Sequence, residues 1–378
     1  MPQLRETLIA SLIGRLPIGI AGLAILLFVQ RRSGSFALAG TASALYVLGL
    51  AVVAPFLGRL TDRLSPTPVL ITCGLLYPAA LAGLAALVMV SGPRISIAAM
   101  AFIAGATLPP ISACVRAIYP RLVSEPALLQ TAYSVDSALV EVVFVLGPAL
   151  VAGCVALDHP EAAVLTAAAT AAAGCAGFVR SPAVKAWKPS GRTDKRSLLE
   201  GVGSPRLLVV FAATVLYSIA FGLFELAVTA HAANKGTPAA GGIALAMASL
   251  GSGAGAVVYG SRHWAAPIRR QFILTLIAMS AGILLLVPID NLVLYSLASI
   301  VTGIPMATVI ATQSLLIARF APRERLAESF TWGATCLLVG VSSGIALGGA
   351  FAERYAPSWL LIAACAATAC AALIALGV

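Results

Sequence analysis

The chain has 378 residues, of which 60% are hydrophobic and 10% are charged. Soluble domains carry about 25% charged residues, so this composition excludes an ordinary water-soluble protein and predicts an integral membrane protein. The formal net charge is +10. Because the excess of Lys and Arg falls in loops between apolar runs, it provides no argument for nucleic acid as a partner.

Twelve apolar runs are long enough to cross a bilayer, which takes about 20 residues in a helix. They lack the alternation of a barrel strand, so we predict an all-α membrane protein with twelve transmembrane helices. The first run is interpreted as a retained span, because no cleavage site of small residues follows it. The runs cover residues 8–29, 37–57, 69–90, 95–117, 128–153, 160–179, 207–230, 239–260, 272–288, 292–318, 328–352 and 358–377.

Lys and Arg are distributed unevenly between the two sides of the membrane. With the N-terminus inside, the inside segments carry 18 of these residues and the outside loops carry five. Cytoplasmic loops are enriched in Lys and Arg, so we predict that both termini are cytoplasmic. We expect a monomer surrounded by the lipid bilayer of a bacterial inner membrane.

The longest polar segment, residues 180–206, separates the sixth span from the seventh. It divides the chain into an N-terminal six-helix bundle (1–180), a cytoplasmic central loop (181–206) and a C-terminal six-helix bundle (207–378). The two halves resemble each other after the second and eighth spans and after the fourth and tenth spans. Gly58 corresponds there to Gly260, and Pro120 to Pro322, at the same offset of 202 residues. This shared offset predicts a tandem duplication and two pseudo-symmetric bundles.

The loop after the second span reads GRLTDRLSPTPVL, from Gly58 to Leu70. It resembles the signature loop of the major facilitator superfamily, whose pattern is close to Gly-x-Leu-Ala-Asp-Arg-x-Gly-Arg-Lys. The second half of the loop departs from the pattern, because Ser, Pro and Thr replace Gly and basic residues. The resemblance implies a twelve-helix transporter that works by alternating access. The matching positions are Gly58, Leu60, Asp62 and Arg63.

The resemblance also implies a gate on the cytoplasmic side, in which the motif acid latches the N-terminal half to the start of the eleventh helix. Asp62 is expected near the positive N-terminus of that helix, and Glu324 and Glu328 are possible partners for Arg63. The alternative is a solvated turn. Arg116 follows the helix-breaking pair Pro109-Pro110 and is interpreted as a gate or anchor residue. The corresponding loop of the second half lacks the acid, so we expect a latch on one side only.

The fifth span carries a partial match to the Gly-Pro-x-x-Gly-Gly ending that is typical of facilitator antiporters. Gly147, Pro148 and Gly153 match, and the resemblance favours export. Proline bends a helix, and Gly147 allows a close neighbour.

Four charged residues lie within the predicted spans, where each costs about 2.5–3.5 kcal/mol. Arg15 and Asp136 each lie about 11–12 Å from the cytoplasmic ends of their spans at 1.5 Å per residue, so we predict that they form a pair. Glu141 lies near mid-membrane and is the more desolvated acid. The alternative is a static ion pair with a hydrogen-bonded Glu141. The proton-coupling candidates are Asp136, Glu141, Arg15 and Glu225.

The seventh span places Tyr217, Phe221 and Phe224 on one face that Glu225 borders. Such an aromatic wall beside an acid is a candidate site for an amphipathic substrate. Aromatic residues that face lipid or other helices are the alternative. Weaker cavity candidates are Tyr46, Gln313 and Trp332.

The seven cysteines form no CxxC pair and the three histidines are scattered, so we expect no metal and no cofactor. No catalytic constellation supports an enzyme, and no signalling segment supports a receptor. We therefore predict a secondary active transporter for small molecules, with proton-coupled efflux of amphipathic compounds as its function. The alternative is an importer or exporter of a polar metabolite, such as a sugar, an organic acid or a siderophore. Only two Asn occur in the chain, which counts against a sugar site.

Overall fold

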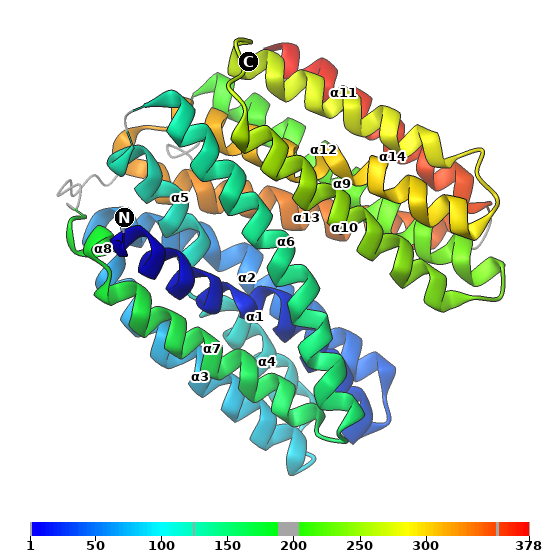
Figure 1. The fold of residues 1–378 in the computed structure, drawn as a ribbon. Helices are drawn as coiled ribbons and strands as arrows, with labels where there is room; N and C mark the ends of the chain where they lie inside the picture. Colours follow the sequence, from blue (N-terminus) through cyan, green and yellow to red (C-terminus); the bar gives the residue numbers. More distant parts are fainter. Residues whose placement is uncertain (1, 124, 188–203, 353–354, 378) are drawn as a thin grey trace. The chain divides into compact units, whose positions relative to one another are not determined.

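The structure is a computed structural model that describes residues 2–123, 125–187, 204–352 and 355–377. Across these ranges all regular elements are helices, and twelve spans are long and apolar enough to cross a membrane. The predicted all-α fold is therefore confirmed, and the chain is a multi-pass integral membrane protein (Figure 1).

The helices begin and end where proline, glycine and polar residues interrupt the apolar runs. Proline occupies the first turn of α3, α7, α8, α9, α10 and α14, where its missing N–H costs no helical hydrogen bond. The helices before the central segment are α1 (Pro2–Ser33), α2 (Phe36–Leu64), α3 (Pro66–Met89), α4 (Arg94–Ala106), α5 (Ile111–Leu122), α6 (Pro126–Ala156), α7 (Pro160–Arg180) and α8 (Pro182–Lys185). Those after it are α9 (Pro205–Asn234), α10 (Pro238–Ser261), α11 (Ile268–Leu286), α12 (Leu292–Phe320), η2 (Arg323–Arg325), α13 (Leu326–Ala352), α14 (Pro357–Ile374) and η3 (Ala375–Gly377).

The fourth span is broken, as its sequence predicts. Helix α4 ends at Ala106 and α5 begins at Ile111, so that Pro109 and Pro110 lie between them. Proline has no N–H for the helical ladder, and the residue before a proline avoids helical dihedrals. Two consecutive prolines therefore separate the span into two helices.

Contacts divide the chain into two compact units. Unit 1 comprises residues 1–122, 142–196 and 323–331, and unit 2 comprises 123–141, 197–322 and 332–378. Helix α6 therefore changes unit after Glu141, and α13 changes unit after Thr331. The predicted bundles placed each of these helices wholly in one half. Most of the predicted central loop, residues 188–203, lies outside the described residues.

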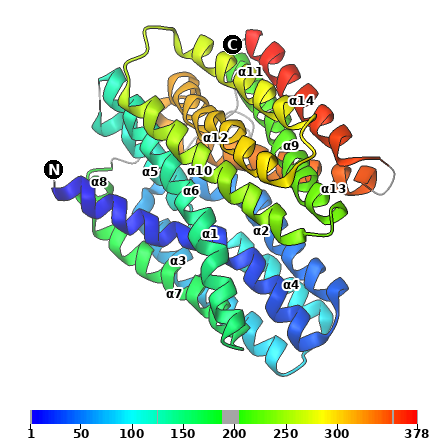
Figure 2. The ribbon, with the colours of Figure 1, turned by 45° about the vertical axis from the view of Figure 1, so that its right-hand side comes forward.

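The duplication is visible in the way each unit packs. In unit 1, α1 lies along α7 and α2 along α4; in unit 2, the corresponding pairs are α9 with α14 and α10 with α12 (Figures 1 and 2). Glycines bring the backbones together at Gly49 and Gly105 between α2 and α4, and at Gly251 and Gly303 between α10 and α12. A Cβ atom at any of these four would lie 2.2 Å or less from a carbonyl oxygen of the partner helix. Gly49 and Gly251 are 202 positions apart, so the offset predicted from the loops recurs in the packing.

The glycines of the fifth span have different surroundings. A Cβ atom at Gly147 would lie 2.5–2.8 Å from the backbone of Gly19 on α1, whereas at Gly153 it would meet nothing within 4 Å. The predicted close neighbour of Gly147 is thus confirmed. Helix α6 continues through Pro148.

A substitution at the α10–α12 crossing tests this packing. In Gly251→Ala the added methyl group would lie 1.9 Å from the Ile300 carbonyl oxygen, so the two helices must separate. Overpacking costs about 1–3 kcal/mol, and we expect the detergent-solubilised protein to melt a few degrees lower. Thermal unfolding of Gly253→Ala provides the control, because a Cβ atom there meets nothing within 4 Å. Equal melting temperatures for the two variants would contradict the close crossing.

Candidate functional site

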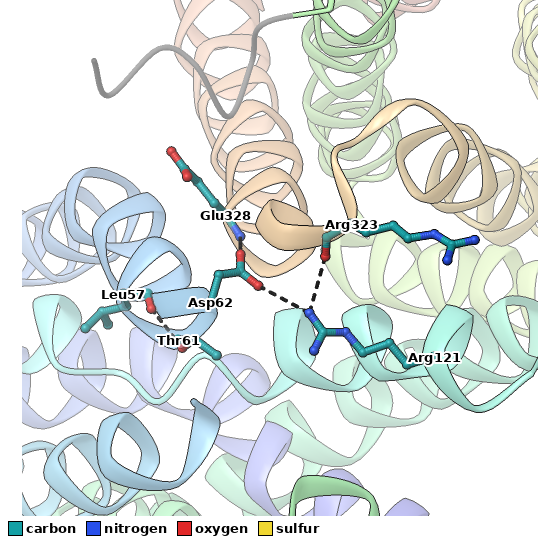
Figure 3. Close-up of polar contacts among 6 residues, drawn as sticks. All are labelled: Leu57, Thr61, Asp62, Arg121, Arg323 and Glu328. Carbon is teal, nitrogen blue, oxygen red and sulfur yellow. Dashed lines mark hydrogen bonds and ion pairs between the residues drawn. The ribbon is translucent and has the colours of Figure 1, made fainter. Parts of the chain in front are cut away.

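The end of α2 contacts the start of α13 through a buried carboxylate. Asp62, which is 3% exposed, accepts a hydrogen bond on Oδ2 from the backbone N–H of Glu328 at 2.8 Å (Figure 3). Glu328 is the third residue of α13, and the first N–H groups of a helix have no partner within the helix. The positive end of the helix also favours an anion. The predicted position of Asp62 at this helix start is therefore confirmed.

Arg121, in the last turn of α5, supplies the positive charge next to Asp62. Its Nη2 lies 3.9 Å from Asp62 Oδ1 and donates a hydrogen bond to the carbonyl oxygen of Arg323 at 3.3 Å (Figure 3). The guanidinium also lies over the Trp187 ring, 3.6 Å from its centroid, where a cation–π interaction holds it. One arginine thus connects α2, η2 and Trp187, the second residue after α8.

The contact between α2 and α13 leaves no room for a side chain at Gly58. A Cβ atom at Gly58 would lie 2.3 Å from Thr331 Oγ1 and 2.8 Å from the Ala327 carbonyl oxygen. Arg59 Nε lies 3.6 Å from the buried carboxylate of Glu328. We call the group formed by Gly58, Asp62, Arg121 and Glu328 the Asp62 clasp; all four belong to unit 1.

The remaining predicted gate residues lie around this clasp. Leu60 and Arg63 have exposed side chains on α2, and Arg116 is half-buried on α5. The pairing of Arg63 with Glu324 or Glu328 stays a prediction. Arg121 and Arg59 were not singled out from the sequence. Arg121 had a usable signal, because it follows Pro120 in the repeated loop and corresponds to Arg323 at the 202-residue offset.

A second junction, in unit 2, joins the start of α6 to the end of α10. Gln130 Nε2 donates to the carbonyl oxygens of Tyr259 at 3.0 Å and Arg262 at 3.1 Å. Thr131 Oγ1 donates to the Gly260 carbonyl oxygen at 2.8 Å. We call the group formed by Gln130, Thr131 and Gly260 the Gln130 clasp.

The Gln130 clasp is a neutral contact at the position where the second half lacks the acid; the expectation of a latch on one side only stays a prediction. The loop after α10 lacks the acid, but the last carbonyls of a helix also need partners, and neutral donors on α6 provide them. Gly260 again marks the contact, because a Cβ atom there would lie 2.6 Å from Ser134 Cβ. Gly58 and Gly260 are the pair that the repeat aligned, so corresponding glycines serve corresponding helix contacts.

Glu141 has a hydroxyl partner in unit 2. Ser252 on α10 donates to Glu141 Oε1 at 2.7 Å, and Ser252 Oγ accepts the backbone N–H of Ala307 on α12 at 2.9 Å. Ser252 is 1% exposed. A hydroxyl has one hydrogen, and the N–H of Ala307 occupies an acceptor position, so the hydrogen of Ser252 is directed to the carboxylate. Sequence reasoning did not identify Ser252, since nothing in the sequence distinguishes it from other serines in apolar runs.

The other membrane charges lie in different surroundings. Arg15 is buried in unit 1 and Asp136 is buried in unit 2, and their pairing stays a prediction. Glu225 is exposed on α9.

Three of the predicted cavity residues come together in unit 2. Tyr217 on α9 donates its hydroxyl to Gln313 Oε1 on α12, and its ring meets Phe221 edge to face at 5.6 Å between centroids. Phe224 is buried, and Trp332 is half-buried with no hydrogen-bond partner for its indole N–H among the described residues. Tyr46, in unit 1, lies 3.1 Å from the Tyr77 hydroxyl. Contact of these residues with a substrate stays a prediction.

Metal ligands do not gather in the parts of the chain that the structure describes. Among those residues, no group of three or more His, Cys, Asp or Glu could hold a metal ion.

A sequence profile described as Major Facilitator Superfamily matches residues 7–325. The chain belongs to the major facilitator superfamily. It is 30% identical over 293 residues to the uncharacterized MFS-type transporter y4rN of Sinorhizobium fredii (strain NBRC 101917 / NGR234). The aligned region covers 73% of this chain and 69% of that protein.

Solved structures of other transporters have a similar fold. A bacterial homologue of the iron transporter ferroportin, in its outward-facing state, matches with a TM-score of 0.81 at 14% identity, over 100% of this chain and 99% of that one. The Escherichia coli fucose:proton symporter matches with a TM-score of 0.71 at 15% identity, over 99% and 98% of the two chains. At 14% and 15% identity, these similarities show a shared fold and carry no statement about the substrate. Membership of the superfamily makes this protein a transporter and not an enzyme.

Removal of the Asp62 carboxylate tests the clasp of this superfamily member. In Asp62→Ala the Glu328 amide loses a hydrogen bond to a charged acceptor, which is worth about 1.5–3 kcal/mol. We expect hydrogen exchange across residues 326–331 to become roughly 10- to 100-fold faster, as measured by mass spectrometry. Thr61→Val is the matched control, because the Thr61 hydroxyl bonds within α2 to the Leu57 carbonyl (Figure 3). Unchanged exchange in Asp62→Ala would show that the carboxylate does not hold this amide.

Proposed function

We propose that this transporter exports amphipathic small molecules in exchange for protons, by alternating access, as a monomer in a bacterial inner membrane with both termini in the cytoplasm. The observation that carries the proposal is the hydrogen bond from Ser252 to Glu141, a carboxylate in the middle of a membrane span. The excess of Lys and Arg in the inside segments supports the orientation.

Glu141 has the properties of a proton carrier. It is half-buried and lies where an ionised carboxylate costs about 2.5–3.5 kcal/mol, so its charge is worth neutralising by a proton. The directed hydroxyl of Ser252 stabilises the ionised form. Protonation removes the charge and weakens this hydrogen bond, because charge-assisted hydrogen bonds are about twice as strong as neutral ones. Proton binding would therefore loosen the contact between α6 and α10.

The two clasps would control access. The Asp62 clasp holds residues 323–331 against α2, and the Gln130 clasp holds the start of α6 against α10. Alternating access in this class moves one six-helix repeat against the other, and both α6 and α13 contribute residues to each unit. We propose that the clasps release these helix starts when the substrate site opens to the cytoplasm. The charged clasp and the neutral clasp would then resist opening to different extents.

The substrate class follows from the group around Tyr217. The Tyr217 and Phe221 rings and the Gln313 amide pack together in this structure, with Tyr217 and Gln313 buried. We propose that they line the substrate site when it opens, where few polar groups would suit an amphipathic molecule. Export is favoured by the Gly147-Pro148 pair, whose glycine closely approaches α1. A polar metabolite is the alternative substrate, and its transport would overturn the amphipathic assignment while leaving the fold untouched.

Transport by proteoliposomes under an imposed pH gradient tests the proposal. The screen compares amphipathic dyes with sugars and organic acids, and we expect gradient-driven movement of the dyes only. Glu141→Gln should abolish the response to the gradient and retain downhill exchange, since its side chain cannot ionise. Glu161→Gln, an acid at the start of α7 outside the proposed site, is the control. Preserved coupling in Glu141→Gln would refute the role of Glu141, and dye transport that ignores the gradient would refute proton coupling.

A further inference from the structure

Helices α11 and α14 form an apolar groove on unit 2. Its volume is about 520 Å³. Ala281, Ala369 and Ala372 contribute small side chains to its lining, and Ile277 and Leu373 contribute large ones. The last two side chains are 51% and 66% exposed, so the groove opens outward along two membrane-spanning helices.

The groove has the length of one leaflet of a bilayer. Its lining on α11 runs from Ile273 to Leu284, a rise of about 16 Å at 1.5 Å per residue. The hydrocarbon core of a bilayer is about 30 Å thick, so the groove spans about half of it. A single extended acyl chain fits this length and this apolar lining.

One end of the groove is positively charged. Arg269 and Arg270 are exposed in the first turn of α11, one turn before Ile273. Arg269 also donates to the Leu376 carbonyl oxygen, so it is held where the groove ends. Neither α11 nor α14 contains an acidic residue.

These two arginines lie at the end of α11 where the helix dipole disfavours positive charge. The N-terminus of a helix is already positive and favours anions, whereas Lys and Arg are stabilised at the C-terminus. An anion bound at this end would relieve the repulsion and complement both side chains. A phosphate group lies just beyond the hydrocarbon in a bilayer, which is where the first turn of α11 places the arginines.

We propose that the α11–α14 groove binds an anionic phospholipid, with one acyl chain along its apolar lining and the phosphate at Arg269 and Arg270. With the termini in the cytoplasm, the lipid belongs to the cytoplasmic leaflet. Basic residues beside helix pairs on that side are a recognised basis for binding anionic headgroups. This lipid is distinct from the transported substrate, because the groove lies apart from Tyr217 and Glu141.

Lipid retention by the purified protein tests this site. Native mass spectrometry and thermal unfolding in detergent compare phosphatidylglycerol with phosphatidylcholine of identical acyl chains. We expect more retained phosphatidylglycerol and a larger increase in melting temperature with it. Arg270→Gln and the double variant Arg269→Gln/Arg270→Gln should lose that difference, and Ala369→Phe, which fills the groove, should retain less of both lipids.

The double variant Arg31→Gln/Arg32→Gln is the matched control, because it removes two adjacent exposed arginines from α1. It should keep the preference for phosphatidylglycerol, and loss of the preference there would show a nonspecific charge effect and overturn the site. Equal retention of the two lipids by the unmodified protein, or full retention by Arg270→Gln and Ala369→Phe, would also overturn it. Glycerol phosphate alone is a further probe; if it stabilised the protein as well as the lipid does, the arginines would bind phosphate without the groove.

Discussion

The cost of leaving a polar group without a partner in hydrocarbon governs this structure. Water cannot satisfy such groups at membrane depth, so Ser and Thr side chains bond to carbonyls of their own helix, and several larger polar side chains have partners on neighbouring helices. Glu141 has Ser252, Tyr217 has Gln313, and Tyr46 lies beside the Tyr77 hydroxyl. Each pair joins two helices within one unit. These contacts therefore determine which helix faces meet, in addition to any part they have in transport.

The two clasps satisfy the same requirement at helix ends by different chemistry. At the Asp62 clasp an anion accepts from the free N–H groups of α13, whereas at the Gln130 clasp neutral donors bond to the last carbonyls of α10. The helix dipole explains the difference, because an acid is favoured at a helix start and disfavoured at a helix end. A duplicated loop has thus diverged in charge while keeping its position and its glycine.

The sequence predicted the fold in detail because bilayer thickness, helix rise and proline chemistry act on local residues. The twelve spans, the break at Pro109-Pro110 and the 202-residue repeat all follow from such patterns. The site was less accessible to prediction. Asp62 was found because it belongs to a motif, but Ser252 and Gln130 are ordinary polar residues whose roles depend on how each helix is rotated. Hydropathy alone does not determine that rotation.

The glycine crossings have a mechanical consequence. At Gly49, Gly105, Gly251 and Gly303 the backbones touch with no side chain between them, so these contacts contain no rotamers that could rearrange. Such a backbone contact resists sliding and twisting of the two helices, because the smallest shift brings carbonyl oxygens against Cα atoms. The α2–α4 and α10–α12 pairs should therefore move as rigid rods during any conformational cycle. Deformation would then be concentrated at contacts made by side chains, which can adopt a second arrangement.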